Sequence, residues 1–124
     1  MQGFPKSQRL LRHSDFRRVY SEGRRFFAAH MTVFYVPRQD ASGAAWRVGY
    51  TVGKVFGGAV ERNRMKRRLR EAVRLSEFES GIAADIVIHP RPSLAARNFS
   101  ALRDDIEKAF EAIERSLAKE KLAR

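Results

Sequence analysis

The alternation of apolar and polar positions predicts three strands. Residues 26–37 (FFAAHMTVFYVP) and 44–53 (AAWRVGYTVG) are rich in β-branched and aromatic residues and alternate in the way that half-buried strands do. The polar residues RQDASG between them predict a turn, so we expect a hairpin, with its first strand interrupted near Ala28. A short apolar run at residues 84–90 (ADIVIHP) predicts a third, buried strand.

Two segments near the ends of the chain carry the spacing of helices. Residues 13–23 (HSDFRRVYSEG) predict a helix of about two turns, with Ser14 as the N-cap and Gly23 as a left-handed end. Residues 98–122 predict a long amphipathic helix. Its apolar stripe comprises Phe99, Leu102, Ile106, Phe110, Ile113 and Leu117. The order of these elements predicts an α+β domain in which helices pack on one small sheet.

The segment ERNRMKRRLREAVRL, at residues 61–75, combines an apolar stripe with a dense cationic side. At about 100° per residue, one side of a helix would carry Met65, Leu69, Ala72, Val73 and Ser76. The opposite side would carry Asn63, Arg67, Arg70 and Arg74, flanked by Lys66, Arg64 and Glu71. The planar guanidinium of arginine can bind phosphate oxygens in pairs and stack on bases. The segment therefore predicts a helix that presents cations to a nucleic acid; the alternative is a solvated face whose arginine stems cover apolar surface.

Composition adds a polyanionic partner to this picture. The formal net charge is +11 and the isoelectric point is near 11.0. These values favour a nucleic acid as partner, with an anionic membrane surface as the second choice. The 124 residues predict one domain over residues 1–124, with residues 1–8 and 120–124 loosely packed. The sequence has no cysteine, no apolar tract long enough to span a membrane and no secretory signal, so we expect a cytoplasmic protein.

Neither catalytic nor metal-binding spacing is found in the sequence. His13, His30 and His89 lack the spacing of metal ligands, and the adjacent Asp104 and Asp105 would diverge by about 100° on a helix. An enzyme in its own right is therefore disfavoured. A ribosomal or DNA-binding structural protein would fit the charge equally well.

The string GGAVERNRMKRRLREAVR, with Arg62-Asn63-Arg64 at its core, closely resembles the signature helix of the bacterial ribonuclease P protein component. Two further segments agree in order. LLRHSDFRRVYSEGRR is similar to the first helix of that family, and RVGYTVGKVFGGAV is similar to the strand and turn before the signature. The resemblance covers roughly residues 9–92, and the ribosomal or DNA-binding alternative does not account for three ordered segments.

The resemblance implies a fold and a function. The fold is a small αβββαβα sandwich (ribosomal protein S5 domain 2-like) with a left-handed β-α-β crossover, against the usual right-handed rule. The function is that of the protein subunit of ribonuclease P, an endoribonuclease that removes the 5′ leader of precursor tRNA. In that family the catalyst is an RNA subunit, which also holds most of the Mg²⁺, so this chain would carry no catalytic residue and no metal. Its partners would be the catalytic RNA and precursor tRNA, with one protein per RNA, a monomer when alone, and no membrane.

The resemblance also assigns two binding surfaces by position. Contacts to the catalytic RNA fall on Lys54, Arg62, Asn63, Arg64, Lys66, Arg67 and Arg70. A cleft between the first helix and the sheet would bind the single-stranded leader through Phe16, Tyr20, Phe34 and Thr51. The residues themselves allow such a cleft, because aromatic rings near arginines suit single-stranded RNA, although any one of these rings could equally be core. We leave Phe26, Phe27, Trp46, Phe78, Phe99 and Phe110 in the core or unassigned.

The sequence departs from the family pattern just before the signature. The family often has a second basic residue after Lys54 and then Gly-Asn-Ala-Val, where this chain has Val55 and Gly57-Gly58-Ala59-Val60. Contacts from Val55 and Gly58 are therefore not carried over. Glu61 places a carboxylate where it would favour the helix N-terminus.

Overall fold

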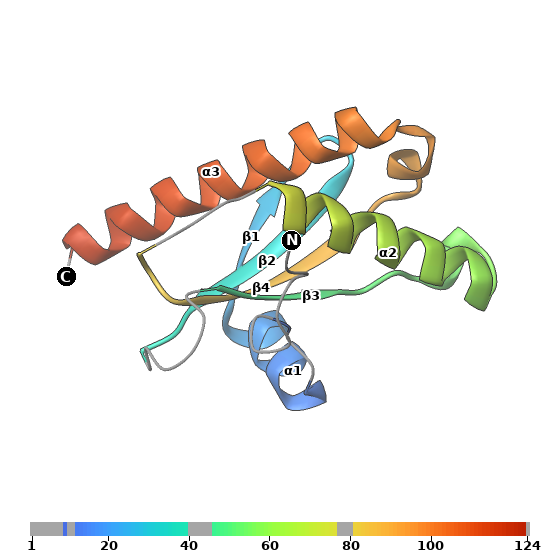
Figure 1. Cartoon of the computed structure of the whole chain (residues 1–124). Coiled ribbons are helices and arrows are strands. Elements are labelled where there is room, and N and C mark those ends of the chain that lie inside the picture. Colours follow the sequence, from blue (N-terminus) through green and yellow to red (C-terminus); the bar gives the residue numbers. More distant parts are fainter. Residues whose placement is uncertain (1–8, 10–11, 40–45, 77–80, 124) are drawn as a thin grey trace.

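The computed structural model describes Arg9 and residues 12–39, 46–76 and 81–123, arranged as Figure 1 shows. In chain order the elements are α1 (His13–Glu22), β1 (Arg24–Phe27), β2 (Met31–Pro37), β3 (Trp46–Tyr50), α2 (Ala59–Leu75), β4 (Ala84–Pro90) and α3 (Phe99–Ala123). Short 3₁₀ turns at Lys54–Phe56 and Pro92–Ala96 precede α2 and α3. This order is the αβββαβα sequence that the resemblance implied.

The strands form one mixed sheet in the order β1-β2-β4-β3. The break expected near Ala28 separates β1 from β2, which pair antiparallel with each other. The hairpin predicted between residues 26–37 and 44–53 is wrong, because β4 lies between β2 and β3. It runs antiparallel to β2 and parallel to β3. β4 is buried at every residue except His89. A strand this apolar buries the most surface when it has a neighbouring strand on each side. The local patterns of β2 and β3 do not indicate that another strand lies between them.

Helices cover both faces of the sheet: α1 lies on one face, and α2 and α3 lie on the other (Figure 1). Between α2, α3 and the sheet is the main core. Its strand residues include Val33, Tyr35, Trp46, Val48, Ile86 and Ile88. A smaller cluster under α1 contains Val19, Val36 and Val87. α2 connects the neighbouring parallel strands β3 and β4, and the left-handed sense of that crossover stays a prediction.

The apolar side predicted for α2 is confirmed as its docking side. Met65, Leu69, Ala72 and Val73 are buried and belong to the main core, whereas Ser76 is the C-cap and is half-buried. The long C-terminal helix also follows its pattern: in α3, the five residues from Leu102 to Leu117 that continue the predicted stripe are buried, and Phe99 packs against them in part. The amphipathic spacing therefore decided how both helices dock.

The two ends of α1 are formed differently from the prediction. Arg12, not Ser14, occupies the N-cap position, and no side chain caps the helix there. Gly23 follows the helix with φ −79° and ψ 164°, which is extended rather than left-handed backbone. A Cβ on Gly23 would lie 2.3 Å from the Val19 carbonyl oxygen and 2.9 Å from that of Tyr35. Glycine is therefore required by the close approach of α1 to β2.

The unassigned aromatic residues divide between core and surface. Trp46 and Phe110 are buried in edge-to-face contact, with ring centroids 5.1 Å apart, and Phe26 and Phe99 are partly buried. Phe27 is 65% exposed. Phe78 and residues 1–8 lie outside the described residues. Of residues 120–124, which we expected to be loose, those up to Ala123 are helical, and Glu120 pairs with Arg24 of β1 at 2.5 Å.

Candidate nucleic-acid interface

The outward side of α2 forms what we call the α2 cationic face. It consists of Arg62, Asn63, Arg64, Lys66, Arg67 and Arg70. Asn63, Arg64, Arg67 and Arg70 are exposed and the other two are partly exposed. Within the described parts of the chain, none of its cations forms an ion pair with a carboxylate. The charge of this face is therefore available to an anionic partner.

The remaining arginines of α2 have partners inside the protein. Arg74 pairs with Glu71, and that hydrogen bond holds the pKa of Glu71 below its usual range. The Nη2 of Arg68 donates to the Arg97 carbonyl oxygen at 2.5 Å, which ties α2 to the start of α3. Among the described residues, the cations of α2 that have no partner of this kind thus lie between Arg62 and Arg70.

Lys54 is exposed in the 3₁₀ turn that precedes α2. The turn closes through Gly57, whose φ of 115° is a left-handed conformation that favours glycine. Val55 in the same turn is 71% exposed. Glu61 stands in the first turn of α2, as expected for a carboxylate at a helix N-terminus.

Tyr20, Phe34 and His89 form a ring cluster where α1 crosses the sheet. The ring centroids of Tyr20 and Phe34 are 5.0 Å apart, those of Tyr20 and His89 are 5.4 Å apart, and those of Phe34 and His89 are 5.3 Å apart. All three contacts are edge-to-face, a favoured geometry for aromatic rings. The rings are half-buried, so the cluster has both a packed side and a solvent side.

Hydrogen bonds fix the orientation of the ring cluster. The Tyr20 hydroxyl lies 2.5 Å from Thr51 Oγ1 and 2.7 Å from His89 Nε2. Burial raises the pKa of Tyr20, against a smaller lowering by the Thr51 hydrogen bond, and burial lowers the pKa of His89. Both groups are therefore neutral near pH 7. Three of the four residues predicted for the leader cleft, Tyr20, Phe34 and Thr51, are thus in one contact group.

Phe16, the fourth residue predicted for the leader cleft, packs against the small apolar cluster of Val19, Val36 and Val87 under α1. It lines a hollow of about 190 Å³ together with residues from β3 and α2. The lining residues are Arg9, Phe16, Val48, Gly49, Tyr50, Lys66 and Arg70. Arg70 lies over the ring of Tyr50, 6.0 Å from its centroid. The hollow joins the α2 cationic face to the aromatic side of α1.

His89 belongs to the ring cluster and Arg25 lies against it, although neither residue was expected there from the sequence. The guanidinium carbon of Arg25 lies 5.3 Å from the centroid of the Phe34 ring, a cation–π distance. The alternation of β4 could have found His89, because Asp85, Val87 and His89 share the strand face towards α1. Polar residues on one face of an otherwise apolar strand were the available signal.

Asp85, also missed, is a fully buried carboxylate held by three arginines. Its Oδ2 accepts hydrogen bonds from Arg18 Nη2 at 2.8 Å and from Arg47 Nη2 at 2.7 Å. Its Oδ1 accepts one from Arg47 Nε at 2.8 Å and lies 3.2 Å from Arg38 Nε. Arg18 belongs to α1, so this cluster and the ring cluster hold α1 on the sheet at two points.

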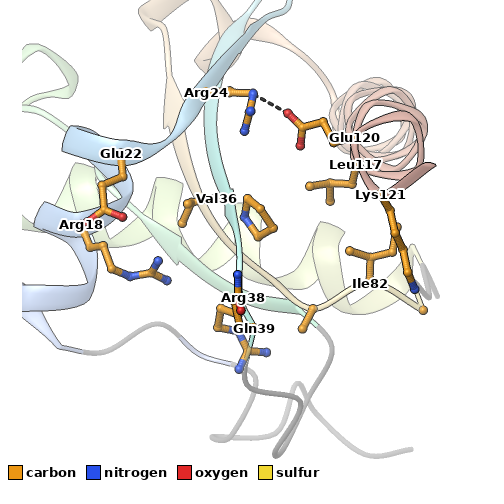
Figure 2. A pocket seen from close by; sticks show the side chains of 13 residues that line it. Arg18, Glu22, Arg24, Val36, Arg38, Gln39, Ile82, Leu117, Glu120 and Lys121 are labelled. Carbon is orange, nitrogen blue, oxygen red and sulfur yellow. Dashed lines mark ion pairs between the residues drawn. The ribbon is translucent and has the colours of Figure 1, made fainter. Parts of the chain in front are cut away.

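A second hollow, of about 570 Å³, opens between the ends of α1, β2 and α3 (Figure 2). Its lining mixes charges of both signs. Arg24 pairs with Glu120 across it, as Figure 2 shows, and Arg18 is held by Asp85. Because these cations already have carboxylate partners, we do not assign this hollow to the nucleic-acid interface.

Two kinds of feature are absent from the described residues. No group of three or more His, Cys, Asp or Glu side chains among them could hold a metal ion. No helix in the described ranges combines the length and the apolar character needed to cross a membrane.

Comparison with known sequences shows similarity along most of the chain. The family model described as Ribonuclease P matches residues 4–114. The ribonuclease P protein component of Desulforapulum autotrophicum is 38% identical over 117 residues, which cover 91% of this chain and 94% of that protein. That of Oleidesulfovibrio alaskensis is 39% identical over 92 residues, covering 74% of this chain and 73% of that protein.

Comparison with solved structures shows the same fold. The ribonuclease P protein of Thermotoga maritima superposes with a TM-score of 0.71 at 26% identity, covering 86% of this chain and 96% of that one. The ribonuclease P protein of Staphylococcus aureus superposes with a TM-score of 0.75 at 24% identity, covering 88% and 97%.

Proposed function

This chain belongs to the bacterial ribonuclease P protein component family, as a subunit of the endoribonuclease that matures the 5′ end of tRNA, and we propose that two of its surfaces divide the RNA contacts. The α2 cationic face, with Lys54, binds the catalytic RNA subunit of the enzyme. The ring cluster, with Phe16 and Thr51, binds the single-stranded 5′ leader of precursor tRNA.

The observation that carries this proposal is the difference in chemistry between the two surfaces. The α2 cationic face has exposed arginines without carboxylate partners among the described residues, which suits the phosphates of a large folded RNA. The ring cluster offers half-exposed rings with Arg25 over one of them, which suits unpaired bases. The hollow at Phe16, Lys66 and Arg70 would let one strand pass from one surface to the other.

The proposal also includes the stoichiometry of the complex, the position of the Mg²⁺ and the location of the protein in the cell. One protein binds one RNA subunit, and the free protein is a monomer. The Mg²⁺ that phosphodiester hydrolysis requires is held mainly by the RNA subunit, and this chain supplies neither a metal ligand nor a catalytic residue. The cytoplasmic location expected from the sequence is part of the proposal too.

Leader binding can be tested with Phe34→Ala in the holoenzyme reconstituted with the cognate catalytic RNA. We expect weaker binding of precursor tRNA by a factor of roughly five to a hundred, because stacking of a base on an aromatic ring is worth about 1–3 kcal/mol. Binding of mature tRNA, which has no leader, should change little. A thermal melt of each variant controls for folding, and an equal loss for both tRNAs would assign the ring to structure.

The proposed roles of the protein and the RNA subunit can also be tested by measuring cleavage of precursor tRNA. The purified chain alone should cleave no precursor tRNA, and its addition to the catalytic RNA should raise cleavage at low Mg²⁺, because its cations offset repulsion between two RNAs. Mg²⁺-dependent turnover by RNA-free protein that survives nuclease treatment would contradict the proposal.

A further inference from the structure

Phe27, the last residue of edge strand β1, is an exposed aromatic ring beyond the ring cluster, with 65% of its surface accessible. The alternation of β1 indicates which face it shares. Phe26 packs against the main core under α2 and α3, whereas Arg25 lies over Phe34 on the α1 side. Phe27 follows Arg25 by two residues, so it shares the α1 face with the ring cluster.

Strand register places Phe27 in line with His89. Phe27 pairs with Thr32 of β2, and Thr32 pairs in turn with His89 of β4. Neighbouring strands lie about 4.8 Å apart, so the Cα atoms of Phe27 and His89 are roughly 10 Å apart across the sheet. A short stretch of extended single-stranded RNA can span that separation.

Two arginines flank the path between the ring cluster and Phe27. Arg91 donates from Nη2 to Thr32 Oγ1 at 3.1 Å and from Nη1 to the Ala28 carbonyl oxygen, so it is fixed beside the middle of the path. Arg25 is fixed over Phe34 at the other side. In the part of the chain that the structure describes, neither forms an ion pair with a carboxylate. Their charge is free for phosphate groups.

We propose that Phe27 is a second stacking position for single-stranded RNA. A base of the 5′ leader beyond those at the ring cluster stacks on the Phe27 ring, while Arg25 and Arg91 bind the intervening phosphates. One exposed phenylalanine is ordinary protein surface. What specifies a nucleotide is the face that Phe27 shares with the ring cluster, together with two arginines that have no carboxylate partner among the described residues. This inference rests on the proposed leader binding and extends it towards the sheet edge.

The test uses the reconstituted holoenzyme and precursor tRNAs whose leaders are shortened one nucleotide at a time. Phe27→Val removes the ring but keeps a residue that favours strands, and Phe27→Trp keeps a ring. Leu122→Ala, on another exposed apolar residue (86% accessible) far along α3, is the matched control. We expect Phe27→Val to weaken binding of long-leader precursors by roughly five- to a hundred-fold. Phe27→Trp and Leu122→Ala should bind as the parent does.

Precursors with shortened leaders distinguish a failure of the Phe27 position from a failure of the proposed leader binding as a whole. The loss in Phe27→Val should vanish once the leader is shortened past Phe27, at a length where Phe34→Ala still weakens binding. A leader-dependent loss in Phe34→Ala with none in Phe27→Val would overturn the second position alone. No leader dependence in Phe34→Ala would overturn the proposed function itself.

A fluorescent base and the oligomeric state add independent readouts. 2-Aminopurine placed at the leader position that stacks on Phe27 should be quenched in the parent complex and brighter with Phe27→Val. Because β1 is an edge strand, the competing occupant is a second copy of this chain. Light scattering that shows a parent homodimer lost in Phe27→Val, with leader binding unchanged, would overturn the proposal.

Discussion

The Tyr20 hydroxyl of α1 lies 2.7 Å from Nε2 of His89 in β4, although the two residues are 69 positions apart in the chain. The same hydroxyl contacts Thr51 at 2.5 Å, so one phenol joins α1 to the loop after β3 and to the central strand. A single hydroxyl thus holds together α1, the loop after β3 and β4, and changes in its partners should affect both stability and the proposed leader binding.

The pH dependence of stability should contain a contribution from His89. Burial lowers its pKa in the folded protein, so the unfolded chain, with an ordinary pKa of about 6.5, binds the proton first as the pH falls. The free energy of unfolding should therefore decrease as the pH falls through about 6.5 towards the lowered folded-state pKa. Urea unfolding across this range would measure the decrease, and His89→Gln should show a flatter profile than the parent. Parallel profiles for the parent and His89→Gln would contradict the assignment.

Loss of the Asp85 carboxylate should destabilise the fold strongly. Asp85→Ala would leave Arg18, Arg38 and Arg47 facing one another without the buried charge between them. Removing one member of a buried ion pair costs roughly 3–5 kcal/mol, and the partial exposure of Arg18 and Arg47 favours the lower end. Urea unfolding would measure the loss. Asp105→Ala, which breaks the more exposed pair with Arg97, is the matched control and should cost much less than Asp85→Ala.

Two glycines should respond in opposite directions to a methyl group. Gly23→Ala would force a Cβ against the Val19 and Tyr35 carbonyls, and overpacking of this kind costs about 1–3 kcal/mol. Gly53→Ala meets no atom within 4 Å and needs no left-handed backbone, so a small gain of up to about 1 kcal/mol is expected from the restricted unfolded chain. Thermal melts of both variants would measure the difference, and equal shifts would contradict the close approach at Gly23.

The two sides of α2 should separate stability from RNA binding. Leu69→Ala, at a fully buried position, should cost roughly 2–5 kcal/mol of stability through lost burial and the cavity left behind. A triple alanine variant at Arg64, Arg67 and Arg70 should melt at nearly the parent temperature. Its affinity for the catalytic RNA should fall, and the slope of log affinity against log salt should become shallower by up to about 0.7–0.9 per lost phosphate contact. An unchanged slope and affinity would mean that this face is merely solvated.

The sequence by itself determined the elements whose signal is local. The two sides of α2 follow from the helical period, because residues three and four apart meet whatever the rest of the fold does. The apolar run at residues 84–90 coincides with β4, and the ordered motifs placed the chain in its family. Tyr20, Phe34 and Thr51 were grouped by resemblance, and the structure brings them into contact.

Only the tertiary structure decided which strands pair and which polar groups meet. The local pattern favoured a hairpin between residues 26–37 and 44–53, because a short turn closes at low entropic cost. The sheet instead places β4 in its centre, because that strand buries apolar side chains on both faces. Once β4 is central, Asp85 is buried among arginines from α1, from β3 and from the position just after β2, and His89 lies beside Tyr20. These contacts join residues far apart in the chain, and a buried charge or imidazole is stable only where the fold supplies its partners, which no local pattern encodes.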